Sequence, residues 1–281
     1  MNEIFIDDLK LISNKIKQYN EFGKIIGFVP TMGNLHEGHL SLINKARLEC
    51  DEVIVSIFIN KKQFNDKNDY LNYPKTLDSD INLLKKCNVS HVFYPKNNDI
   101  YPENFSCSLS IPAMDHILCA SDRPGHFDGV ALILTKLFNI ITPNKVYFGL
   151  KDYQQFILVN KLVDFLNFNI DVIGVDTVRE DTGLALSSRN NLLTSNERLN
   201  IAPILFAQLI KIKNLVRNVK DISQLLIETR KFLLESGFSK VDYLTILDND
   251  LKEVKTQNYN NSRIFAAAYI RNIRLIDNIA L

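Results

Sequence analysis

The hydrophobic pattern of the first 180 residues alternates between strand-like and helix-like segments. Short runs of β-branched and aromatic residues predict strands at 24–30, 51–60, 90–95, 145–149 and 171–178. Between them, apolar residues recur with helical spacing and predict helices at 39–50, 76–87, 127–141 and 152–166. The predicted strands are apolar almost throughout, as in parallel strands covered on both faces. We therefore expect a doubly wound, Rossmann-like α/β domain that binds ligands at the carboxyl ends of its strands.

The pattern changes after residue 180. Two amphipathic helices are predicted at 195–217 and 221–236, and two strands follow at 241–247 and 263–270. We therefore divide the chain into a Rossmann-like domain, residues 1–180, and a smaller α+β domain, residues 181–281. The loop at 179–191 joins the two domains.

Composition narrows the class of protein. The 281 residues are 46% hydrophobic, which is enough for a sizeable core, and the net charge of +1 gives no electrostatic reason to expect nucleic acid as a partner. The four cysteines form no CxxC pair, which argues against disulfides and structural zinc. The apolar stretch 130–141 is too short to span a bilayer, and the start MNEIFIDDLK lacks the features of a signal peptide. We expect a cytoplasmic enzyme.

The stretch PTMGNLHEGHLSL, residues 30–42, contains two histidines three positions apart. The strand before it should end at Pro30 and the next helix should begin close to Gly38. The unpaired N–H groups and the dipole of a helix start attract anions, so His36 and His39 could donate to a phosphate. A glycine turn with two histidines on the helix face is the simpler alternative. A metal site is the third, although HEGH is one residue short of the zinc-protease HExxH.

A second candidate follows the predicted strand 145–149, in FGLKDYQQF. Asp152 and Gln155 could simply form a capping box. Lys151, however, lies at the positive end of the next helix, which is unfavourable for a cation unless an anion is bound beside it.

The third candidate is LALSSRNN, residues 184–191, at the domain junction. Serines before an arginine are ordinary in a solvated loop, but Arg189 offers a planar group with several donors for phosphate. Together the three stretches predict a nucleoside triphosphate site.

Two further features have a structural and a functional interpretation. Gln63, just past the strand 51–60, is either incidental or an amide that holds a small polar substrate. In RPGHFDGV, residues 123–130, Arg123 and His126 precede an apolar helix. They either anchor a loop or belong to the site.

The chain resembles the pantothenate synthetase (pantoate–β-alanine ligase) family over nearly its whole length. The resemblance lies in five motifs that occur in the order and spacing of that family: PTMGNLHEGH, QF, RPGHFDGV, FGLKDYQQ and LALSSRN. The resemblance places the chain in the nucleotidyltransferase group with a His-x-Gly-His signature. It implies ATP-dependent condensation of pantoate with β-alanine through pantoyl adenylate, with release of AMP and pyrophosphate. The product is pantothenate, a precursor of coenzyme A. The resemblance also implies a homodimer.

The resemblance further implies roles for residues at matching positions. The implied catalytic residues are His36, His39, Lys151 and Arg189, with His39 in the place of the proton donor. The implied ATP-binding residues are Met32, Gly33, Asn34, Leu35, His36, Glu37, Gly38, His39, Gly149, Leu150, Lys151, Asp152, Val178, Leu186, Ser187, Ser188 and Arg189. Gln63 and Gln155 are implied to bind pantoate, and Gln63 also β-alanine.

Catalysis requires stabilisation of charge at the phosphates, so we expect Mg²⁺ to be bound mainly through the ATP phosphates rather than in a protein metal site. Asp78 and Asp80 are possible protein ligands, although acids are ordinary in the first turn of a helix. We expect the smaller domain to act as a lid that excludes water from the adenylate.

The chain departs from the family at three positions. Lys61 replaces a proline, Asn65 replaces a common glycine, and Ala120 stands where glycine is frequent. Two other functions fit parts of the pattern. One is an adenylyltransferase that stops at the nucleotidyl product, against which the amides of Gln63 and Gln155 argue. The other is a nucleotide-binding regulator without catalysis, which has no evident need for His39, Lys151 and Arg189 together.

Overall fold

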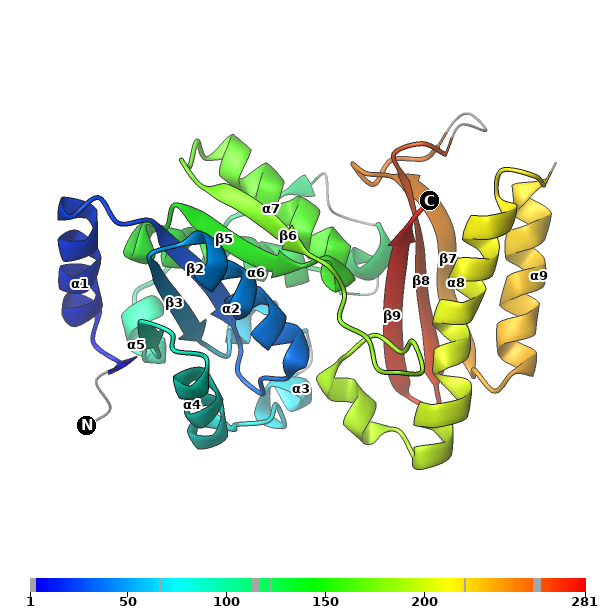
Figure 1. Ribbon diagram of the computed structural model, residues 1–281, viewed down its shortest axis with the longest axis horizontal. Helices are drawn as coiled ribbons and strands as arrows, with labels where there is room; N and C mark the ends of the chain where they lie inside the picture. The colour runs from blue at the N-terminus through cyan, green and yellow to red at the C-terminus, as the bar shows by residue number, and fades with distance from the viewer. Residues whose placement is uncertain (1–3, 66, 113–116, 122, 220, 255–258) are drawn as a thin grey trace. The chain divides into compact units, whose positions relative to one another are not determined.

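The computed structural model describes residues 4–65, 67–112, 117–121, 123–219, 221–254 and 259–281. The chain divides into two compact units (Figure 1). The first contains Met1–Leu150 and Gln154–Val175, and the second contains Lys151–Tyr153 and Asp176–Leu281. The sequence-based boundary was expected at residue 180, and the role of the second unit as a lid stays a prediction.

The first unit is built on a six-stranded parallel sheet with the order β1-β4-β3-β2-β5-β6, so the predicted doubly wound α/β class is confirmed. Its strands are β1 (Phe5–Ile6), β2 (Ile26–Thr31), β3 (Glu52–Ile57), β4 (His91–Phe93), β5 (Lys145–Gly149) and β6 (Asp171–Val175). Most are shorter than the predicted runs, because residues at the ends of those runs lie in the loops.

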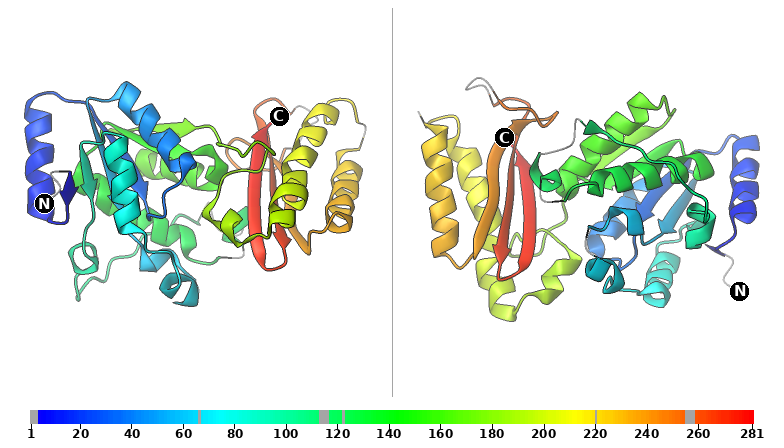
Figure 2. Two further views of the ribbon diagram at one scale, coloured as in Figure 1. Left: turned by 60° about the horizontal axis from the view of Figure 1, so that its bottom comes forward. Right: turned by 180° about the vertical axis from the view of Figure 1, so that it is seen from behind.

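Helices cover both faces of this sheet (Figures 1 and 2). The helices of this unit are α1 (Leu9–Glu21), α2 (Glu37–Glu49), α3 (Lys67–Leu71), α4 (Leu77–Lys86), α5 (Asn97–Ile100), α6 (His126–Ile141) and α7 (Tyr153–Phe165). Successive residues of a strand point to opposite faces. Accordingly, Val29 of β2 packs in one cluster with Ile43 of α2, while the ring of Phe28 meets Phe138 of α6 edge-on.

Strand order places the predicted nucleotide loops next to each other. β2 pairs with β5, with Phe28 opposite Val146. From β2 the chain proceeds to β3 on one side, and from β5 it proceeds to β6 on the other, which makes this pair the topological switch point. Ligands of open α/β sheets bind beyond the carboxyl ends of the strands at such a point. The loop after Thr31 and the turn after Gly149 both lie there.

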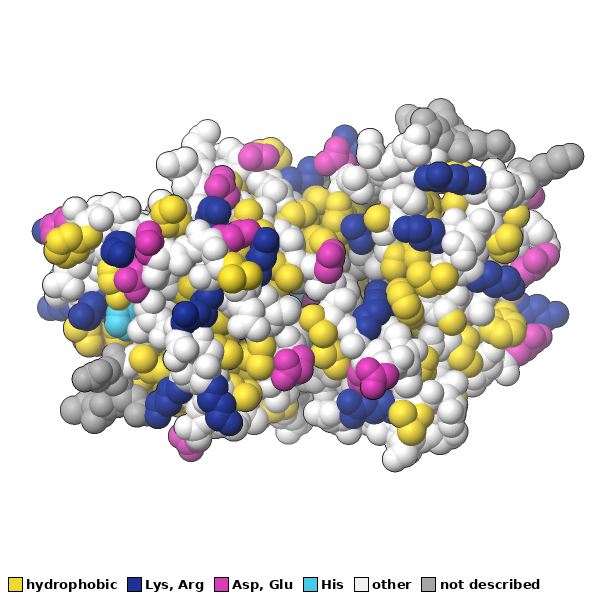
Figure 3. Space-filling view, in the orientation of Figure 1, with side chains coloured by type: hydrophobic (Ala, Val, Ile, Leu, Met, Phe, Trp, Pro, Cys, Tyr) yellow, Lys and Arg dark blue, Asp and Glu magenta, His cyan; other side chains and the backbone are white. Residues whose placement is uncertain are grey.

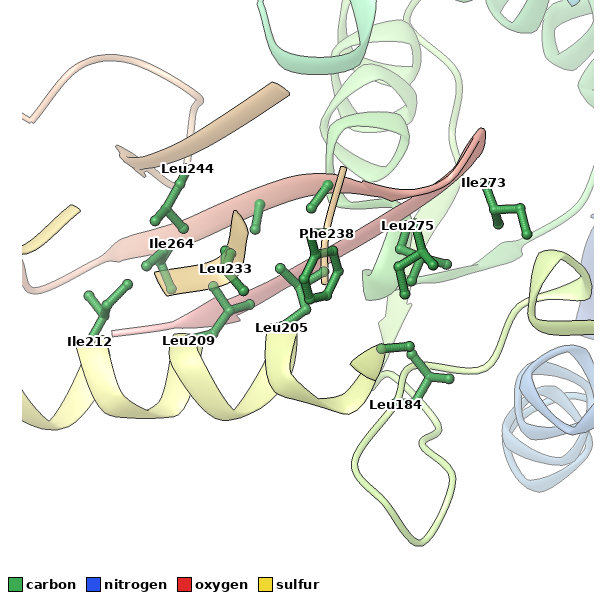
Figure 4. Packing of buried hydrophobic residues seen from close by; sticks show 14 of the residues in the cluster. Leu184, Leu205, Leu209, Ile212, Leu233, Phe238, Leu244, Ile264, Ile273 and Leu275 are labelled. Atoms are coloured by element: carbon green, nitrogen blue, oxygen red, sulfur yellow. The ribbon is translucent and has the colours of Figure 1, made fainter. Parts of the chain in front are cut away.

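The second unit is a three-stranded antiparallel sheet, ordered β7-β8-β9, with two helices packed on it. The strands are β7 (Lys240–Asp248), β8 (Ser262–Ile270) and β9 (Ile273–Ala280), and the helices are α8 (Pro203–Leu215) and α9 (Ile222–Glu235). Figure 4 shows Leu205, Leu209 and Ile212 of α8 turned toward the strands of the sheet. The predicted helix 195–217 is divided into a one-turn π-helix (Glu197–Ile201) and α8, which begins at Pro203.

The surface carries no large region of one charge on the face drawn in Figure 3, where basic and acidic side chains are interspersed. This agrees with the net charge of +1. Within the described residues, no helix combines the length and the hydrophobicity that crossing a bilayer requires.

His91 gives the first unit a pH-dependent stability. The side chain is buried, and its Nε2 lies 2.8 Å from the hydroxyl of Tyr19. Burial, with a smaller contribution from Lys15, lowers the pKa of His91 below its ordinary 6.5. Below that pH the unfolded chain binds a proton that the folded histidine does not. The contribution of His91 to stability is therefore complete above pH 6.5 and lost as the pH falls through the folded pKa.

We predict that His91→Phe, which keeps an aromatic ring beside Tyr19, flattens the decline of the unfolding free energy between about pH 7 and 5. Urea unfolding at a series of pH values measures this decline. Tyr19→Phe is the control, because it retains the imidazole and should retain most of the pH dependence. Equal slopes for wild type and His91→Phe would contradict the assignment.

Candidate active site

The loop after β2 contains two consecutive residues with left-handed backbone, Gly33 (φ 82°) and Asn34 (φ 53°). Glycine and asparagine are the residues that adopt this conformation most readily. At Gly33 the space is also restricted, because a Cβ there would lie 3.0 Å from Oδ2 of Asp80 and 3.2 Å from Ile57. The sequence Gly-Asn is thus suited to a tight turn at the carboxyl end of β2.

Asp80, on α4, fastens this turn. Its side chain is 2% exposed, and its Oδ2 and Oδ1 accept hydrogen bonds of 2.9 Å from the backbone N–H groups of Asn34 and Leu35. The hydroxyl of Thr76 donates to the same carboxylate at 2.9 Å. Both oxygens are therefore engaged within the protein, whereas Asp78 is exposed in the first turn of α4. This arrangement favours a structural role for Asp80 over that of a Mg²⁺ ligand.

His36 and His39 cap the start of α2. The helix begins at Glu37, one residue earlier than predicted, because His36 acts as the N-cap, a role that cap preferences for Ser, Thr, Asp and Asn do not anticipate. Nδ1 of His36 accepts from the N–H of Gly38 at 3.1 Å, and Nδ1 of His39 accepts from the N–H of His36 at 3.3 Å. A nitrogen that accepts carries no proton, so both neutral imidazoles have their proton on Nε2.

Gly38 explains the glycine in HEGH. A Cβ at this position would lie 2.9 Å from Cε1 of His36 and 3.0 Å from its Nδ1. The glycine therefore leaves room for the His36 ring to fold back over the helix start. The ring centres of His36 and His39 lie 4.2 Å apart, so the two imidazoles form a pair.

The structure favours phosphate binding over a metal at this pair. Both Nδ1 atoms are occupied as caps, and the remaining protonated Nε2 is a hydrogen-bond donor rather than a metal ligand. Among the residues with defined positions, no group of three or more His, Cys, Asp or Glu is arranged to hold a metal. A helix start with two imidazole donors has the hydrogen-bonding groups that an anion requires.

Gln63 lies in a 3₁₀ turn (Lys61–Gln63) that follows β3, and its amide has a defined orientation. Its Oε1 accepts from the amide of Asn60 at 3.0 Å, which leaves Nε2 beside the Met32 sulfur, 3.1 Å away. The turn thus brings Gln63 to the loop after β2. Of the predicted substrate-binding residues, Gln63 and Met32 are therefore neighbours.

Asn60 is a site residue that the sequence did not reveal. It is 1% exposed, caps the 3₁₀ turn by accepting from the N–H of Lys62, and donates to Gln63. Burial raises the pKa of Tyr101 far above its ordinary range, so its hydroxyl stays protonated and donates to Oδ1 of Asn60 at 2.9 Å. The spacing of Asn60 and Gln63, three residues apart after a strand, was the available signal.

Gly149 is the last residue of β5, and Leu150 begins the turn that follows; both belong to the first unit. Two adjacent glutamines follow in α7. Gln154 is 5% exposed and bonds the backbone at Cys119 and Ile117, so its role is to hold that segment. Gln155, the predicted pantoate ligand, is half-buried.

The second unit contains the remaining predicted residues. Lys151, Ser187 and Arg189 line one cavity of this unit. The N–H of Leu186 donates to the carbonyl of Val178 at 3.0 Å, which joins the two ends of the loop between them. Ser187 caps the following 3₁₀ turn (Ser188–Leu192) by accepting from the N–H of Arg189. These two bonds involve Val178, Leu186, Ser187 and Arg189, four of the five ATP-binding residues that the sequence predicts between 178 and 189.

Arg179 and Asp277 hold the loop in place. Their bidentate ion pair has N–O distances of 2.6 and 2.9 Å, and the guanidinium also stacks 3.6 Å above the ring of Phe206. The charge of Asp277 is compensated by Arg179, and Nζ of Lys151 lies 3.9 Å from Oδ2 of Asp152. The guanidinium of Arg189 lines the same cavity as Lys151, and such basic groups attract anions.

We predict that Lys61→Pro stabilises the protein by about 0.4–1 kcal/mol. Asn60 already has an extended backbone (φ −80°, ψ 101°) close to the region that a residue before proline prefers, and Lys61 is the first residue of the turn. Lys62→Pro is the matched control, because it would remove the N–H that donates to Asn60 and should destabilise. Urea unfolding measures both, and equal destabilisation by the two prolines would show that the turn is built differently.

Comparison with known proteins relates nearly the whole chain to one family. A sequence profile described as pantoate-beta-alanine ligase matches residues 5–280. Pantothenate synthetase from Caldicellulosiruptor bescii is 39% identical over 277 residues, covering 98% of this chain and 97% of that protein. Pantothenate synthetase from Acinetobacter baumannii is 44% identical over 257 residues, covering 91% and 90%.

Solved structures agree. Pantothenate synthetase from Thermus thermophilus superimposes with a TM-score of 0.89 at 34% identity, covering 98% of each chain. Pantoate-beta-alanine ligase from Francisella tularensis, described as a complex with beta-gamma ATP and beta-alanine, has a TM-score of 0.78 at 38% identity, covering 99% of this chain and 97% of that one. The chain therefore belongs to the pantoate–β-alanine ligase family, as its sequence motifs predicted.

Proposed function

We propose that this chain condenses pantoate with β-alanine at the expense of ATP, through a pantoyl-adenylate intermediate, and releases AMP and pyrophosphate. As a member of this family it is a ligase that forms a C–N bond. The observation that carries the proposal is the pair His36–His39, which presents two Nε2–H donors at the start of α2 and at the switch point of the sheet. The Francisella tularensis relative, described with beta-gamma ATP and beta-alanine, supports the choice of co-substrates.

In the first step, a carboxylate oxygen of pantoate attacks the α-phosphorus of ATP. The bond from that phosphorus to the bridging oxygen breaks, and pyrophosphate leaves with the electron pair. Negative charge builds up on the phosphate oxygens in this step, and positioned donors stabilise it. We assign this role to the His36 and His39 imidazoles and the first N–H groups of α2. From the second unit we assign Lys151 and Arg189 to the same nucleotide.

His39 has a chemical role that follows from its hydrogen bond. With Nδ1 accepting from the N–H of His36, the ring is neutral and carries its proton on Nε2. A neutral imidazole is a very weak acid, so we propose that His39 donates a hydrogen bond to phosphate rather than a proton. This refines the proton-donor role that the family resemblance implies.

Pantoate is proposed to lie between the amides of Gln63 and Gln155. Since Oε1 of Gln63 is bonded to Asn60, its Nε2–H group is the side of the amide that meets substrate oxygen atoms. In the second step, the amine of β-alanine attacks the acyl carbon and AMP leaves with the former carboxylate oxygen. Gln63 serves both steps in this proposal.

ATP is proposed to react as its Mg²⁺ complex, with the ion bound mainly through the phosphates. The engagement of both Asp80 oxygens by the loop and Thr76 supports this, because it commits that carboxylate to the protein. We further propose a homodimer in the cytoplasm. The second unit is proposed to act as a lid, which would protect the adenylate from hydrolysis.

Pyrophosphate exchange tests the function. We predict that labelled pyrophosphate enters ATP when pantoate is present and β-alanine is absent, because the adenylate forms reversibly before the amine is needed. Exchange that depends strictly on β-alanine would exclude the adenylate.

In the same exchange assay, we predict that His39→Asn reduces the rate by about 10²-fold or more, since an asparagine oxygen can keep the cap but the Nε2–H donor is lost. Unchanged thermal unfolding would show that the cap is kept, and near-normal exchange would remove His39 from the mechanism.

We predict that Asp80→Asn lowers the unfolding free energy by about 1–3 kcal/mol and weakens ATP binding, because one buried N–H of the loop loses its acceptor. Asp78→Asn, on the same turn of α4 but exposed, is the matched control and should behave like wild type. Chemical unfolding and the KM for ATP at saturating Mg²⁺ measure both effects. A larger defect in Asp78→Asn, relieved by added Mg²⁺, would instead identify Asp78 as a metal ligand.

A further inference from the structure

His126 is a buried histidine to which the proposed reaction gives no role. It is the first residue of α6, and its Nδ1 lies 2.7 Å from the backbone carbonyl oxygen of Gln63. A carbonyl oxygen only accepts, so Nδ1 of His126 carries the proton in this bond. The sequence left open whether His126 anchors a loop or belongs to the site, and this bond makes it an anchor of the Gln63 loop.

Gly129, one turn further along α6, touches the backbone of the same loop. A Cβ at Gly129 would lie 2.5 Å from the carbonyl carbon of Lys62 and 2.7 Å from the backbone nitrogen of Gln63. These are backbone atoms, which no side-chain rotation can move out of the way. Only glycine therefore lets the first turn of α6 approach the loop this closely.

The side chain of Gln63 is linked through Asn60 to the same turn of α6. The carbonyl oxygen of Gly129 accepts from Nδ2 of Asn60 at 2.9 Å, and the same Nδ2 donates to Oε1 of Gln63. In addition, Asn65, which replaces the family's glycine, donates to the carbonyl of Pro124. The backbone and the amide of Gln63 are thus both located by the segment that precedes and begins α6.

We propose that His126 and Gly129 are positioning residues for Gln63, and that through it they set the affinity for the hydroxy-acid substrate. The inference rests on the proposed function, in which the Gln63 amide binds pantoate. An error of about 1 Å in a substrate-positioning group is enough to cost a large factor in rate. Because the contacts of His126 and Gly129 described above go to the Gln63 turn, we expect their loss to weaken binding of the acid substrate more than that of the nucleotide.

The experiment compares His126→Leu with His126→Asn. The asparagine amide can take the place of Nδ1–H and donate to Gln63, whereas leucine cannot. In pantoate-dependent pyrophosphate exchange, His126→Leu should raise the KM for pantoate about tenfold, the scale of one lost hydrogen bond to a buried group, with the KM for ATP unchanged. His126→Asn should recover most of the pantoate affinity. Asn139→Ala, on an exposed position of the same helix, is the control and should match wild type.

Gly129→Ala should produce the same selective loss of pantoate affinity. If Gly129→Ala fails to fold, the comparison of His126→Leu with His126→Asn still tests the inference. Equal increases in both KM values, or identical behaviour of His126→Leu and His126→Asn, would overturn the inference and leave these residues with a role in packing alone. Failure of the proposed function looks different, because wild type itself would then show no exchange that depends on pantoate.

Discussion

The buried carboxylate of Asp80 and the two backbone N–H groups that it accepts, from Asn34 and Leu35, form the interaction on which the rest of the site depends. Without it the buried N–H of Leu35 would lose its acceptor, at a cost of about 1–3 kcal/mol, while the N–H of Asn34 would keep only the hydroxyl of Thr76 at 3.1 Å. Once this turn is fixed, His36 reaches the cap position of α2, and its backbone N–H fixes His39 in turn. The carboxylate thus fixes the loop that leads into the two imidazoles, whose Nδ1 atoms accept from the backbone of α2's first turn.

Much of the fold could be predicted from the sequence, and the exceptions have physical causes. The central strands are almost wholly apolar, so their presence and their parallel arrangement followed from composition and alternation with helices. Strand β9 was not predicted, because it buries Asp277 and Asn278, whose polarity interrupts the apolar pattern of a strand. Arg179 forms an ion pair with Asp277, and Arg263 donates a hydrogen bond to Asn278. Helix α1 was not predicted, although Ile12 and Ile16 already lie four residues apart on its buried face.

The candidate site was predictable where its residues follow strands directly, and not where they depend on tertiary contacts. His36, Gln63 and Lys151 could be found because loops at the carboxyl ends of parallel strands carry the ligands of this class of fold. The partners that orient them come from distant parts of the chain. Asp80 is 45 residues from Leu35, and His126 is 63 residues from Gln63. No local pattern encodes such pairs, since a buried acid at the start of a helix looks the same in sequence as an exposed one.

The most direct measurement follows an oxygen atom from pantoate. Pantoate labelled with ¹⁸O in its carboxylate is converted in the presence of ATP and β-alanine, and the AMP is analysed by mass spectrometry. If the carboxylate attacks the α-phosphorus and the amine then displaces AMP from the acyl carbon, one labelled oxygen must remain on the AMP phosphate. We expect one ¹⁸O atom in AMP for each pantothenate formed. Label in pyrophosphate or inorganic phosphate, with none in AMP, would contradict the adenylate mechanism.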